Sequence, residues 1–192
     1  MNVTIHEEPS ADLDAYASVS SAFQVQSLLE VNAQAGGLCG VALCEHQVTR
    51  PWLKNYDARE GGPRSWAARF DTERWLALTA SAGGERVGGA LFVRDDPAIE
   101  LLEGRSDLGL LWDLRVAPAF RKRGVGQLLF AAVERLAKQQ GCRALKVETQ
   151  NINVAACRFY ARMGCRLRAI DRFAYPEWPG EVQLLWFKDL AD

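Results

Sequence analysis

The feature that most constrains the fold is the run from Leu111 to Gly126, which reads LWDLRVAPAFRKRGVG. It begins as an apolar strand, and Pro118 ends that strand because proline has no N–H to donate to a neighbour. Three basic residues, a Gly-x-Gly pair and the start of a helix follow. Free N–H groups and the dipole at a helix start favour an anion, and glycine lets a ligand approach the backbone. This order of elements predicts an anion site, best suited to phosphate.

The helix that follows the loop carries one apolar stripe. Its apolar residues recur at the i, i+3, i+4, i+7 spacing of an amphipathic helix, and Gly141 comes after its last turn. The stripe consists of Val125, Leu128, Leu129, Ala132, Val133, Leu136 and Ala137. With a further strand at 144–149, the run predicts a β-α-β unit that has parallel strands and a right-handed crossover.

Strands and short helices are predicted on both sides of this unit. Alternating apolar residues favour a strand at 3–6, a hairpin at 23–48 and another at 74–94 that turns at Gly83-Gly84. A short helix is expected from Ser10, as its N-cap, to about Val19. A second helix at 154–163, capped by Asn151 or Asn153, precedes closing strands at 165–175 and 182–188. Together these elements predict a mixed α/β sheet with helices on both faces.

The stretch 50–69 is the least regular part of the chain. It contains Pro51, Trp52, Gly61, Pro63 and Trp66. A segment this long is usually functional or disordered, and its aromatic residues argue against disorder. Two interpretations stay open: a segment that covers a substrate, or a surface loop packed on its own tryptophans.

Length and composition exclude several classes of protein. A chain of 192 residues suits one domain, and a net charge of −1 gives no overall field toward nucleic acid. The five cysteines, with no C-x-x-C pair, predict reduced thiols in a cytoplasmic protein. The two histidines have no metal-ligand spacing, so no metal is expected. Neither a secretory signal nor a membrane span is expected from the apolar pattern.

Three phosphate-binding patterns can be tested against the loop. A dinucleotide fingerprint needs a small residue at Leu129, and a P-loop needs Lys-Ser/Thr where Gln127 and Leu128 stand. The pattern Arg/Gln-x-x-Gly-x-Gly/Ala fits at every position from Arg121 to Gly126.

That pattern resembles the acetyl-CoA-binding loop of the GNAT superfamily of N-acetyltransferases. Downstream, Asn153, Ala156 and Tyr160, followed by the run Met163-Gly164-Cys165, match the family at the same offsets. Two motifs in the right order, on elements predicted independently, make this a specific resemblance. It covers residues 74–188.

A narrower resemblance is to the streptothricin acetyltransferase group of that superfamily. The runs LWDLRVAP, KVETQNINVAACRFYARMGC and IDRFAYPEWPGEVQLLW are similar to that group, as is the region around Pro51, Lys54, Tyr56 and Asp57. The resemblance implies a single N-acetyltransferase domain over 1–192. Residues 1–70 would supply N-terminal strands and a substrate-side segment, and residues 74–188 the CoA-binding core.

The resemblance also implies a GNAT-type fold and a cofactor. The central sheet would be mostly antiparallel, with one parallel strand pair splayed for CoA. Acetyl-CoA would be the co-substrate, without a metal, and its pantetheine arm would pair with the strand from Leu114 to Val116. The Val116 N–H would stabilise the oxyanion, and Asn153 would bind the pantetheine amide. The pyrophosphate would lie on the backbone N–H groups of Arg121, Lys122, Arg123, Gly124, Val125, Gly126 and Gln127.

Tyr160 is the candidate general acid by resemblance, although its helical spacing also suits a core residue. A general base near the acceptor amine would attract its ammonium form and take its proton. Glu148 is placed slightly ahead of Asp113, with Asp57 third. Asp113 and Arg115 point the same way on the strand and could instead pair with each other.

The predicted function is acetyl transfer from acetyl-CoA to a primary amine of a small cationic substrate. The β-lysine amine of streptothricin is the first expectation, which would inactivate that antibiotic. Trp52, Tyr56, Trp66 and Trp112 could line a pocket for a cation, or lie in the core. A protein, peptide or polyamine N-acetyltransferase and a non-catalytic acyl-CoA sensor are the alternatives. Neither nucleic acid nor membrane is an expected partner, and the oligomeric state, a homodimer included, stays open.

Overall fold

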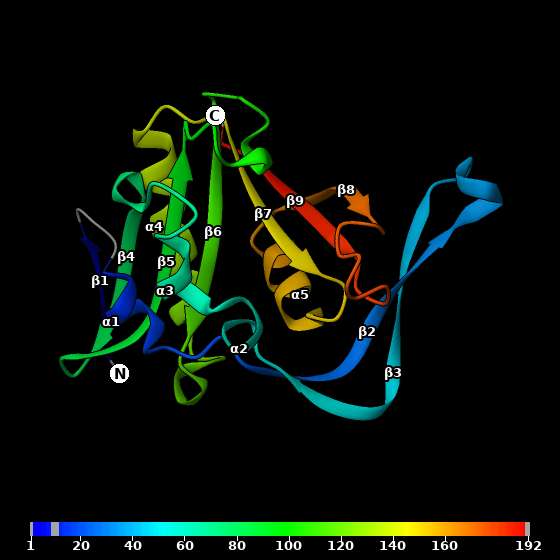
Figure 1. The fold of residues 1–192 in the computed structure, drawn as a ribbon, viewed down its shortest axis with the longest axis horizontal. Coiled ribbons are helices and arrows are strands. Elements are labelled where there is room, and N and C mark those ends of the chain that lie inside the picture. Colours follow the sequence, from blue (N-terminus) through cyan, green and yellow to red (C-terminus); the bar gives the residue numbers. More distant parts are fainter. Residues whose placement is uncertain (1, 9–11, 191–192) are drawn as a thin grey trace. The chain divides into compact units, whose positions relative to one another are not determined.

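The computed structural model describes residues 2–8 and 12–190 (Figure 1). The chain forms two compact units, each made of separate stretches of sequence. The first unit comprises residues 1–22, 55–147 and 187–192, and the second comprises residues 23–54 and 148–186. In the described ranges, no helix is both long enough and apolar enough to cross a membrane.

The first unit is built on a sheet with the strand order β1-β4-β5-β6-β7. Its strands are β1 (Val3–Glu8), β4 (Leu76–Ala82), β5 (Glu85–Arg94), β6 (Leu108–Val116) and the start of β7 (Ala144–Gln150). The first four strands pair antiparallel, and β6 pairs parallel with β7. The strand at the N-terminus, the 74–94 hairpin and the parallel β-α-β unit are therefore confirmed.

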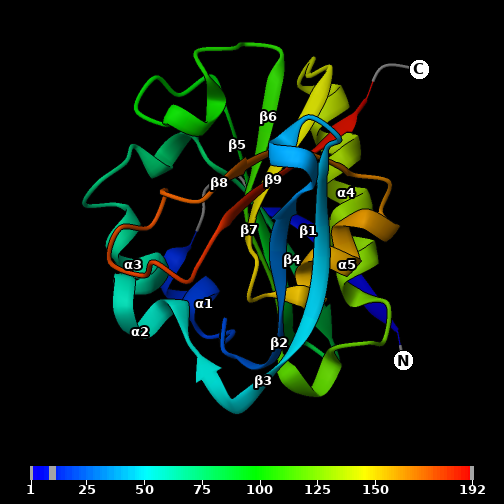
Figure 2. The same ribbon diagram turned by 90° about the vertical axis from the view of Figure 1, so that its right-hand side faces the viewer.

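Helices cover both faces of this sheet (Figure 2). A Cβ built on Gly88 would lie 3.2 Å from Leu129 of α4 (Val125–Gln139), and one on Gly89 would lie 2.6 Å from the ring of Tyr16. Tyr16 belongs to α1 (Leu13–Ala17). Neighbouring strand residues face opposite sides, so α4 and α1 lie on opposite faces. Only glycine permits both close approaches, and the prediction of helices on both faces is confirmed.

Aromatic side chains form the centre of the first unit's core. The ring of Trp75, which is fully buried, lies 4.9 Å from that of Trp112 and 5.9 Å from that of Trp66. The Phe70 ring lies 5.1 Å from that of Trp112. Trp66 and Trp112 therefore have the core role that the sequence left open beside a substrate pocket. Trp52, by contrast, is 40% exposed.

The interpretation of 50–69 as irregular is wrong at its beginning. Residues 50–54 continue β3 (Val41–Lys54), which pairs antiparallel with β2 (Phe23–Ala33) and confirms the first hairpin. The pairing register shifts between Val25 and Ser27, so Pro51 falls in an irregular part of the ladder where its missing N–H is tolerated. The rest forms two short helices, α2 (Tyr56–Glu60) and α3 (Gly62–Trp66).

One helix begins at a different cap from the one predicted, and for a second helix the structure decides between the two predicted caps. Asp12 caps α1, because its side chain accepts a hydrogen bond from the Ala15 N–H at 2.9 Å. The helix ends at Ala17 rather than Val19, and Ser10 lies outside the described residues. In the second unit, Asn153 caps α5 (Val154–Arg162) and accepts from the Ala156 N–H at 3.2 Å.

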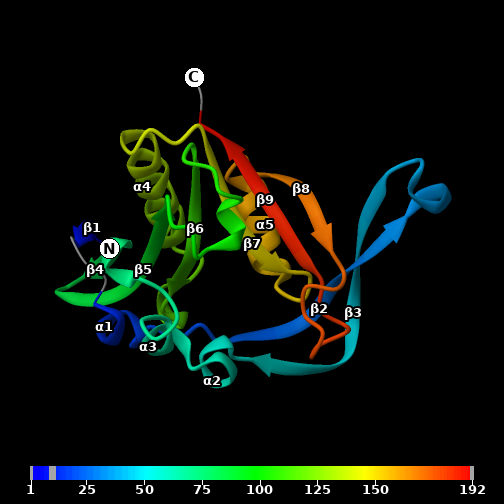
Figure 3. The same ribbon diagram turned by 45° about the horizontal axis from the view of Figure 1, so that its top comes forward.

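The second unit holds the β2–β3 hairpin, α5, β8 (Arg166–Asp171) and most of β9 (Gln183–Asp189). Strand order continues as β7-β9-β8, and β8 lies beside β9 in Figure 3. Asn151 ties the hairpin to this unit: its amide donates to the Leu29 carbonyl at 3.1 Å, and its side-chain oxygen accepts from the Val182 N–H at 2.9 Å. The four 3₁₀ turns of the described chain are Gln34–Gly37, Thr72–Arg74, Glu100–Leu102 and Pro118–Phe120.

Candidate active site

The glycine loop lies at the start of α4, as predicted. Gly124 is the N-cap of this helix with φ 87°, and Lys122 also has a positive φ of 59°. The first N–H groups of a helix have no intrahelical acceptor. Over the ranges that the structure describes, the N–H groups of residues 123–127 donate no hydrogen bond to the protein. They are therefore available to an anion.

The three basic residues of the loop have different surroundings. Lys122 and Arg123 are exposed, and the guanidinium of Arg123 lies over the Phe120 ring at 6.0 Å. Arg121 turns back instead: its Nε donates to the Val116 carbonyl at 2.9 Å and its Nη2 to the Ser20 carbonyl at 3.3 Å. Its backbone N–H donates to the Pro118 carbonyl at 3.3 Å. Partial burial lowers the pKa of Arg121.

The carboxyl end of β6 has a free edge. Residues Leu108–Leu111 pair with Ala144–Val147, and the parallel ladder ends there although β6 continues to Val116. The Ala117 N–H donates to the Val87 carbonyl of β5 at 2.8 Å. Because the backbone groups of successive strand residues point to alternate edges, the N–H groups of Leu114 and Val116 point away from β5. This is the edge that the resemblance assigned to pantetheine.

A buried arginine binds two of the three candidate carboxylates. The side chain of Arg115 is 3% exposed; it donates to Asp113 at 2.6 Å and to the two oxygens of Asp57 at 3.2 and 3.3 Å. It also donates to the Val19 carbonyl at 3.0 Å and lies over the Tyr16 ring. Asp113 and Arg115 pair with each other, as the sequence allowed.

The pKa values of this cluster follow from burial and from the pairing. Burial raises the pKa of Asp113, and the charge of Arg115 opposes that rise without cancelling it. Burial acts to lower the pKa of Arg115, but the charges of Asp113 and Asp57, together with the hydrogen bond to Asp113, act in the opposite direction, and that pKa is raised. Arg115 therefore stays protonated, and both carboxylates are engaged by it.

Glu148, on β7, has a different set of partners. It accepts hydrogen bonds from the Tyr175 hydroxyl and, at 2.9 Å, from the side-chain amide of Gln183. Sequence reasoning missed both donors. A signal for Gln183 was present, because it is the single polar side chain in the apolar run 182–187. Tyr175 lies between β8 and β9, where no periodic pattern assigns it a direction.

Asn153 is the N-cap of α5, and Tyr160 lies within this helix, at the spacing of the family motif. Tyr160 is 6% exposed, and its ring lies 5.1 Å from that of Phe159. Cys157, on the same helix, has its thiol 3.3 Å from the Thr149 hydroxyl, and burial raises the pKa of this thiol to about 11. The burial of Tyr160 fits a core residue, and its role as an acid stays a prediction.

A second buried ion pair holds the connection between β8 and β9. The ammonium of Lys54 lies 2.6 and 2.8 Å from the two carboxylate oxygens of Glu181 and 4.3 Å from the centre of the Trp178 ring. The Trp178 ring lies 6.4 Å from that of Tyr175. The connection that carries Tyr175 is therefore anchored at β3 by a contact that no sequence pattern indicated.

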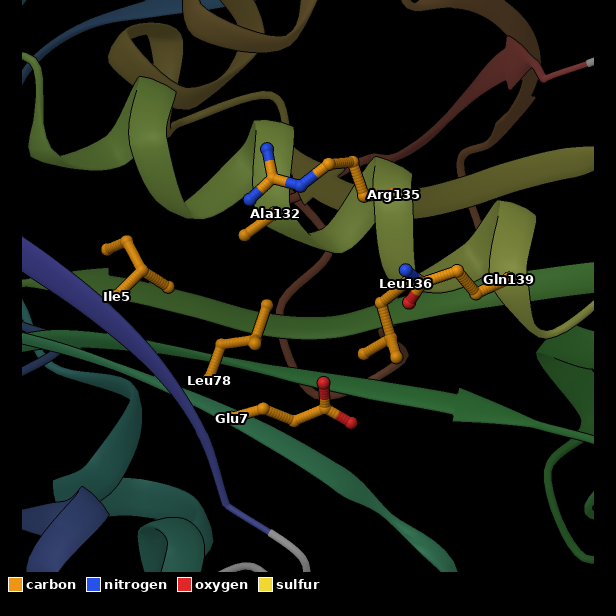
Figure 4. Close-up of a pocket in the computed structure, with 7 residues that line it drawn as sticks. All are labelled: Ile5, Glu7, Leu78, Ala132, Arg135, Leu136 and Gln139. Atoms are coloured by element: carbon orange, nitrogen blue, oxygen red, sulfur yellow. The ribbon is translucent and has the colours of Figure 1, made fainter.

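One pocket of the first unit lies elsewhere. It has a volume of about 170 Å³ and lies between the second half of α4 and strands β1 and β4 (Figure 4). Its lining residues are Ile5, Glu7, Leu78, Ala132, Arg135, Leu136 and Gln139. No predicted site residue is among them. Across residues 2–8 and 12–190, no group of three or more His, Cys, Asp or Glu side chains is arranged to hold a metal ion.

The parallel pair β6 and β7, the glycine loop at the start of α4 and the antiparallel strands before them define an acyl-CoA N-acyltransferase fold. The chain belongs to the acetyltransferase (GNAT) family, whose model matches residues 42–165. The predicted family and fold are both confirmed.

Characterised relatives carry streptothricin acetyltransferase names. Streptothricin acetyltransferase A of Bacillus subtilis (strain 168) is 33% identical over 91 residues, and streptothricin acetyltransferase of Escherichia coli is 32% identical over 92 residues. Each match covers 46% of this chain and 53% of the relative, so the chain spans about half the length of these relatives. A Streptomyces lavendulae streptothricin acetyltransferase is 25% identical over 85% of this chain and 82% of its own length.

Solved structures share the fold over nearly the whole chain. The crystal structure of nourseothricin acetyltransferase has a TM-score of 0.76 at 22% identity and covers all of both chains. A Bacillus anthracis str. Ames protein in complex with acetyl coenzyme A has the same TM-score at 21% identity. The match covers 98% of this chain and 99% of that chain. The ribosomal-protein-S18-alanine N-acetyltransferase of Escherichia coli has a TM-score of 0.63 at 18% identity. The match covers 100% of this chain and 96% of that chain. The fold therefore accommodates acetyltransferases named for quite different acceptors.

Proposed function

We propose that this protein transfers an acetyl group from acetyl-CoA to a primary amine of a small cationic molecule, with streptothricin as the first acceptor to test. The observation that carries the proposal is the glycine loop at the start of α4, with its unpaired N–H groups, directly after the free edge of β6. The streptothricin acetyltransferase relatives support the choice of acceptor.

In this proposal the loop holds the pyrophosphate of acetyl-CoA. The N–H groups of Lys122 to Gln127 donate to it, and the α4 dipole adds to the attraction. The side chains of Lys122 and Arg123, which are exposed, attract the phosphates over a distance that salt limits to about 8 Å. Leu114 and Val116 bind the pantetheine arm through the edge of β6, and Asn153 binds its amide.

The chemical step is direct attack of the amine on the thioester. The nitrogen lone pair forms a bond to the carbonyl carbon, and the carbon–sulfur bond breaks. The Val116 N–H stabilises the oxyanion, a contribution of about 3–4 kcal/mol for a well-aimed donor. Tyr160 gives its proton to the departing thiolate, and the proton lost by the amine goes to the general base.

We assign the base to Glu148 and not to Asp113. A free alkylamine is mostly protonated near pH 7, so the base must both attract an ammonium and accept its proton. Asp113 is held by Arg115 at 2.6 Å, so its carboxylate is already engaged in a buried ion pair, although burial raises its pKa. Glu148 accepts hydrogen bonds from the Tyr175 hydroxyl and from the side-chain amide of Gln183, and matched substitutions of Glu148 and Asp113 decide between the two carboxylates.

The test is release of CoA thiol when the protein is mixed with acetyl-CoA and a panel of acceptors. The panel contains streptothricin, polyamines, and peptides with a lysine or a free N-terminal alanine. We expect thiol release with streptothricin, together with a product heavier by one acetyl group by mass spectrometry. Acetylation of peptides alone would replace the proposal with a protein acetyltransferase. No release with any acceptor, despite measurable CoA binding, would favour an acyl-CoA sensor.

A further inference from the structure

We propose that Arg121 is a positioning residue that fixes the last peptide of β6, and not a ligand of the cofactor phosphates. Its place in a basic loop beside two exposed basic residues suggests a phosphate contact. Its guanidinium is directed elsewhere: both of its hydrogen bonds go to backbone carbonyls, those of Val116 and Ser20. The expected changes in kcat rest on the proposed function, whereas the expected changes in amide hydrogen exchange do not.

The peptide between Val116 and Ala117 is held from two sides. Its carbonyl accepts from Arg121 Nε at 2.9 Å, and its N–H donates to the Val87 carbonyl at 2.8 Å. The carbonyl and the N–H of Val116 point to the same edge of β6, away from β5. The Val116 N–H belongs to the preceding peptide, and holding the peptide after it restricts rotation about the Val116 backbone, which helps to orient the N–H that the proposed mechanism uses as the oxyanion donor.

A second arginine, Arg115, binds the same N-terminal segment as Arg121. Arg115, next to Val116 in the chain, donates to the Val19 carbonyl at 3.0 Å, and Arg121 donates to the following carbonyl, that of Ser20. The Ser21 N–H is held by Asp57 at 3.3 Å. The segment 19–21 is thus fixed independently of the loop, and it gives Arg121 a firm point of attachment at the end of β6.

Partial burial is consistent with this role. It lowers the pKa of Arg121, whereas Lys122 and Arg123 are exposed. A residue that binds phosphate needs a side chain that extends into solvent, toward the incoming anion. A residue that positions the backbone needs several donors in a fixed geometry, and the planar guanidinium of arginine can donate to two carbonyls at once.

Three substitutions separate the two roles. Arg121→Met removes the donors and the charge, Arg121→Lys keeps the charge without the fork, and Arg121→Gln keeps a neutral donor. We expect CoA affinity, measured by calorimetry, to stay within about twofold in all three, because the backbone cradle is intact. We expect kcat to fall about tenfold or more in Arg121→Met and Arg121→Lys, and less in Arg121→Gln, because misdirected donors lower turnover more than binding.

Lys122→Gln and Arg123→Gln are the matched controls. Both remove one positive charge from the same loop, and both should weaken CoA binding by an amount that shrinks as salt is raised. The opposite pattern would overturn the inference: a rise of tenfold or more in the CoA dissociation constant of Arg121→Met that Arg121→Lys restores, with kcat unchanged.

A measurement without turnover keeps this test independent of the proposed function. Amide hydrogen exchange at Ala117 should speed up about tenfold in Arg121→Met relative to wild type, because one of the two bonds holding its peptide is lost. An unchanged Ala117 exchange rate, in a variant that melts at the wild-type temperature, refutes the positioning role. If wild-type protein releases no thiol, the proposed function fails, and the exchange rates together with CoA affinities still decide the role of Arg121.

Discussion

At the scale of single residues, the three candidate carboxylates have two kinds of surroundings. Asp113 and Asp57 both bind Arg115, whose side chain is 3% exposed, whereas Glu148 accepts hydrogen bonds from Tyr175 and Gln183. A carboxylate bound to a buried arginine stabilises the fold, because removing the carboxylate leaves the positive charge of the arginine less compensated. We propose that Glu148 acts as the base and that the pairing of Asp113 with Arg115 serves the fold, and matched variants separate the two roles.

Glu148→Gln should therefore lower kcat/KM for the amine by about 100-fold or more, the usual loss when a general base is removed. CoA affinity and the melting temperature should stay near wild type. Asp113→Asn is the comparison, and it should lower the melting temperature because it weakens the pairing with Arg115. Steady-state kinetics and thermal unfolding check both. An Asp113→Asn protein of normal stability and very low turnover would show that Asp113 is the base.

Tyr160→Phe tests the proposed acid at the same scale. Removing the hydroxyl should lower kcat by about 100-fold, because the thiolate then departs without its proton donor. The Phe ring keeps the contact with Phe159, so CoA affinity and stability should change little. Titration with CoA and single-turnover thiol release measure the two effects. Equal turnover in both proteins would mean that Tyr160 serves the core alone.

The thiol of Cys157 gives a prediction that does not depend on the function. With its pKa raised to about 11, only about one thousandth of this thiol is ionised at pH 8, so it should be far slower than Cys39 and Cys44, both exposed, toward a thiol reagent. The neutral buried form stabilises the fold below the ordinary pKa of 9.0, and this contribution is lost as pH rises from 9 to 11. Cys157→Ala should lose less stability over that range than wild type. Mass spectrometry of labelled peptides and denaturant unfolding at pH 8, 9.5 and 11 provide the measurements.

At the scale of elements, what could be predicted was local. The α4 boundaries follow from Gly124, Gly141 and one apolar stripe, all within the helix or next to it. The end of β3 was missed because Pro51 suggests a loop, whereas the strand is set by pairing with Val25 and its neighbours. The family motif pointed to the loop and to Tyr160, whose roles stay predictions. The direction of Arg121 and the donors to Glu148 depend on residues far away in the sequence, and no local pattern encodes them.

The segment 50–69 illustrates the same limit. Lys54 and Trp66 are buried, in the second and the first unit respectively, and Asp57 is bound by Arg115. These residues belong to the fold, so the segment is not a detachable cover. A role over the substrate stays a proposal for its exposed residues only.

The Lys54–Glu181 pair gives the prediction for elements. Lys54→Ala leaves Glu181, whose side chain is 13% exposed, without its charge partner, and should lower the free energy of unfolding by about 3–5 kcal/mol. The double variant Lys54→Met/Glu181→Leu removes both charges and should recover most of that loss, because neither ion then needs compensation. Urea unfolding of the single and double variants measures the difference. A double variant as unstable as Lys54→Ala would mean that packing on Trp178, and not charge, provides the stability.

At the scale of the whole molecule, the chain passes repeatedly between its two units. The first unit contains three stretches of sequence and the second contains two, and strands β7 and β9 contribute residues to both. Neither unit is a continuous stretch that could be cut out and expressed alone. The sequence-based interpretation of residues 1–192 as a single domain is a statement about cooperativity, and unfolding experiments can test it.

We expect one unfolding transition by scanning calorimetry, with equal calorimetric and van't Hoff enthalpies, because unfolding either unit removes strand segments that continue into the other. Lys54→Ala makes the test sharp, since its ion pair with Glu181 and its contact with the Trp178 ring both lie in the second unit. In a cooperative molecule the single transition moves as a whole to lower temperature. Saturating CoA, at 100 times its dissociation constant, should then restore about 2.7 kcal/mol to the same transition, although the loop proposed to hold its pyrophosphate belongs to the first unit. If Lys54→Ala instead splits the transition, and CoA raises only the part that the variant left unmoved, the two units unfold independently and the single-domain interpretation is wrong.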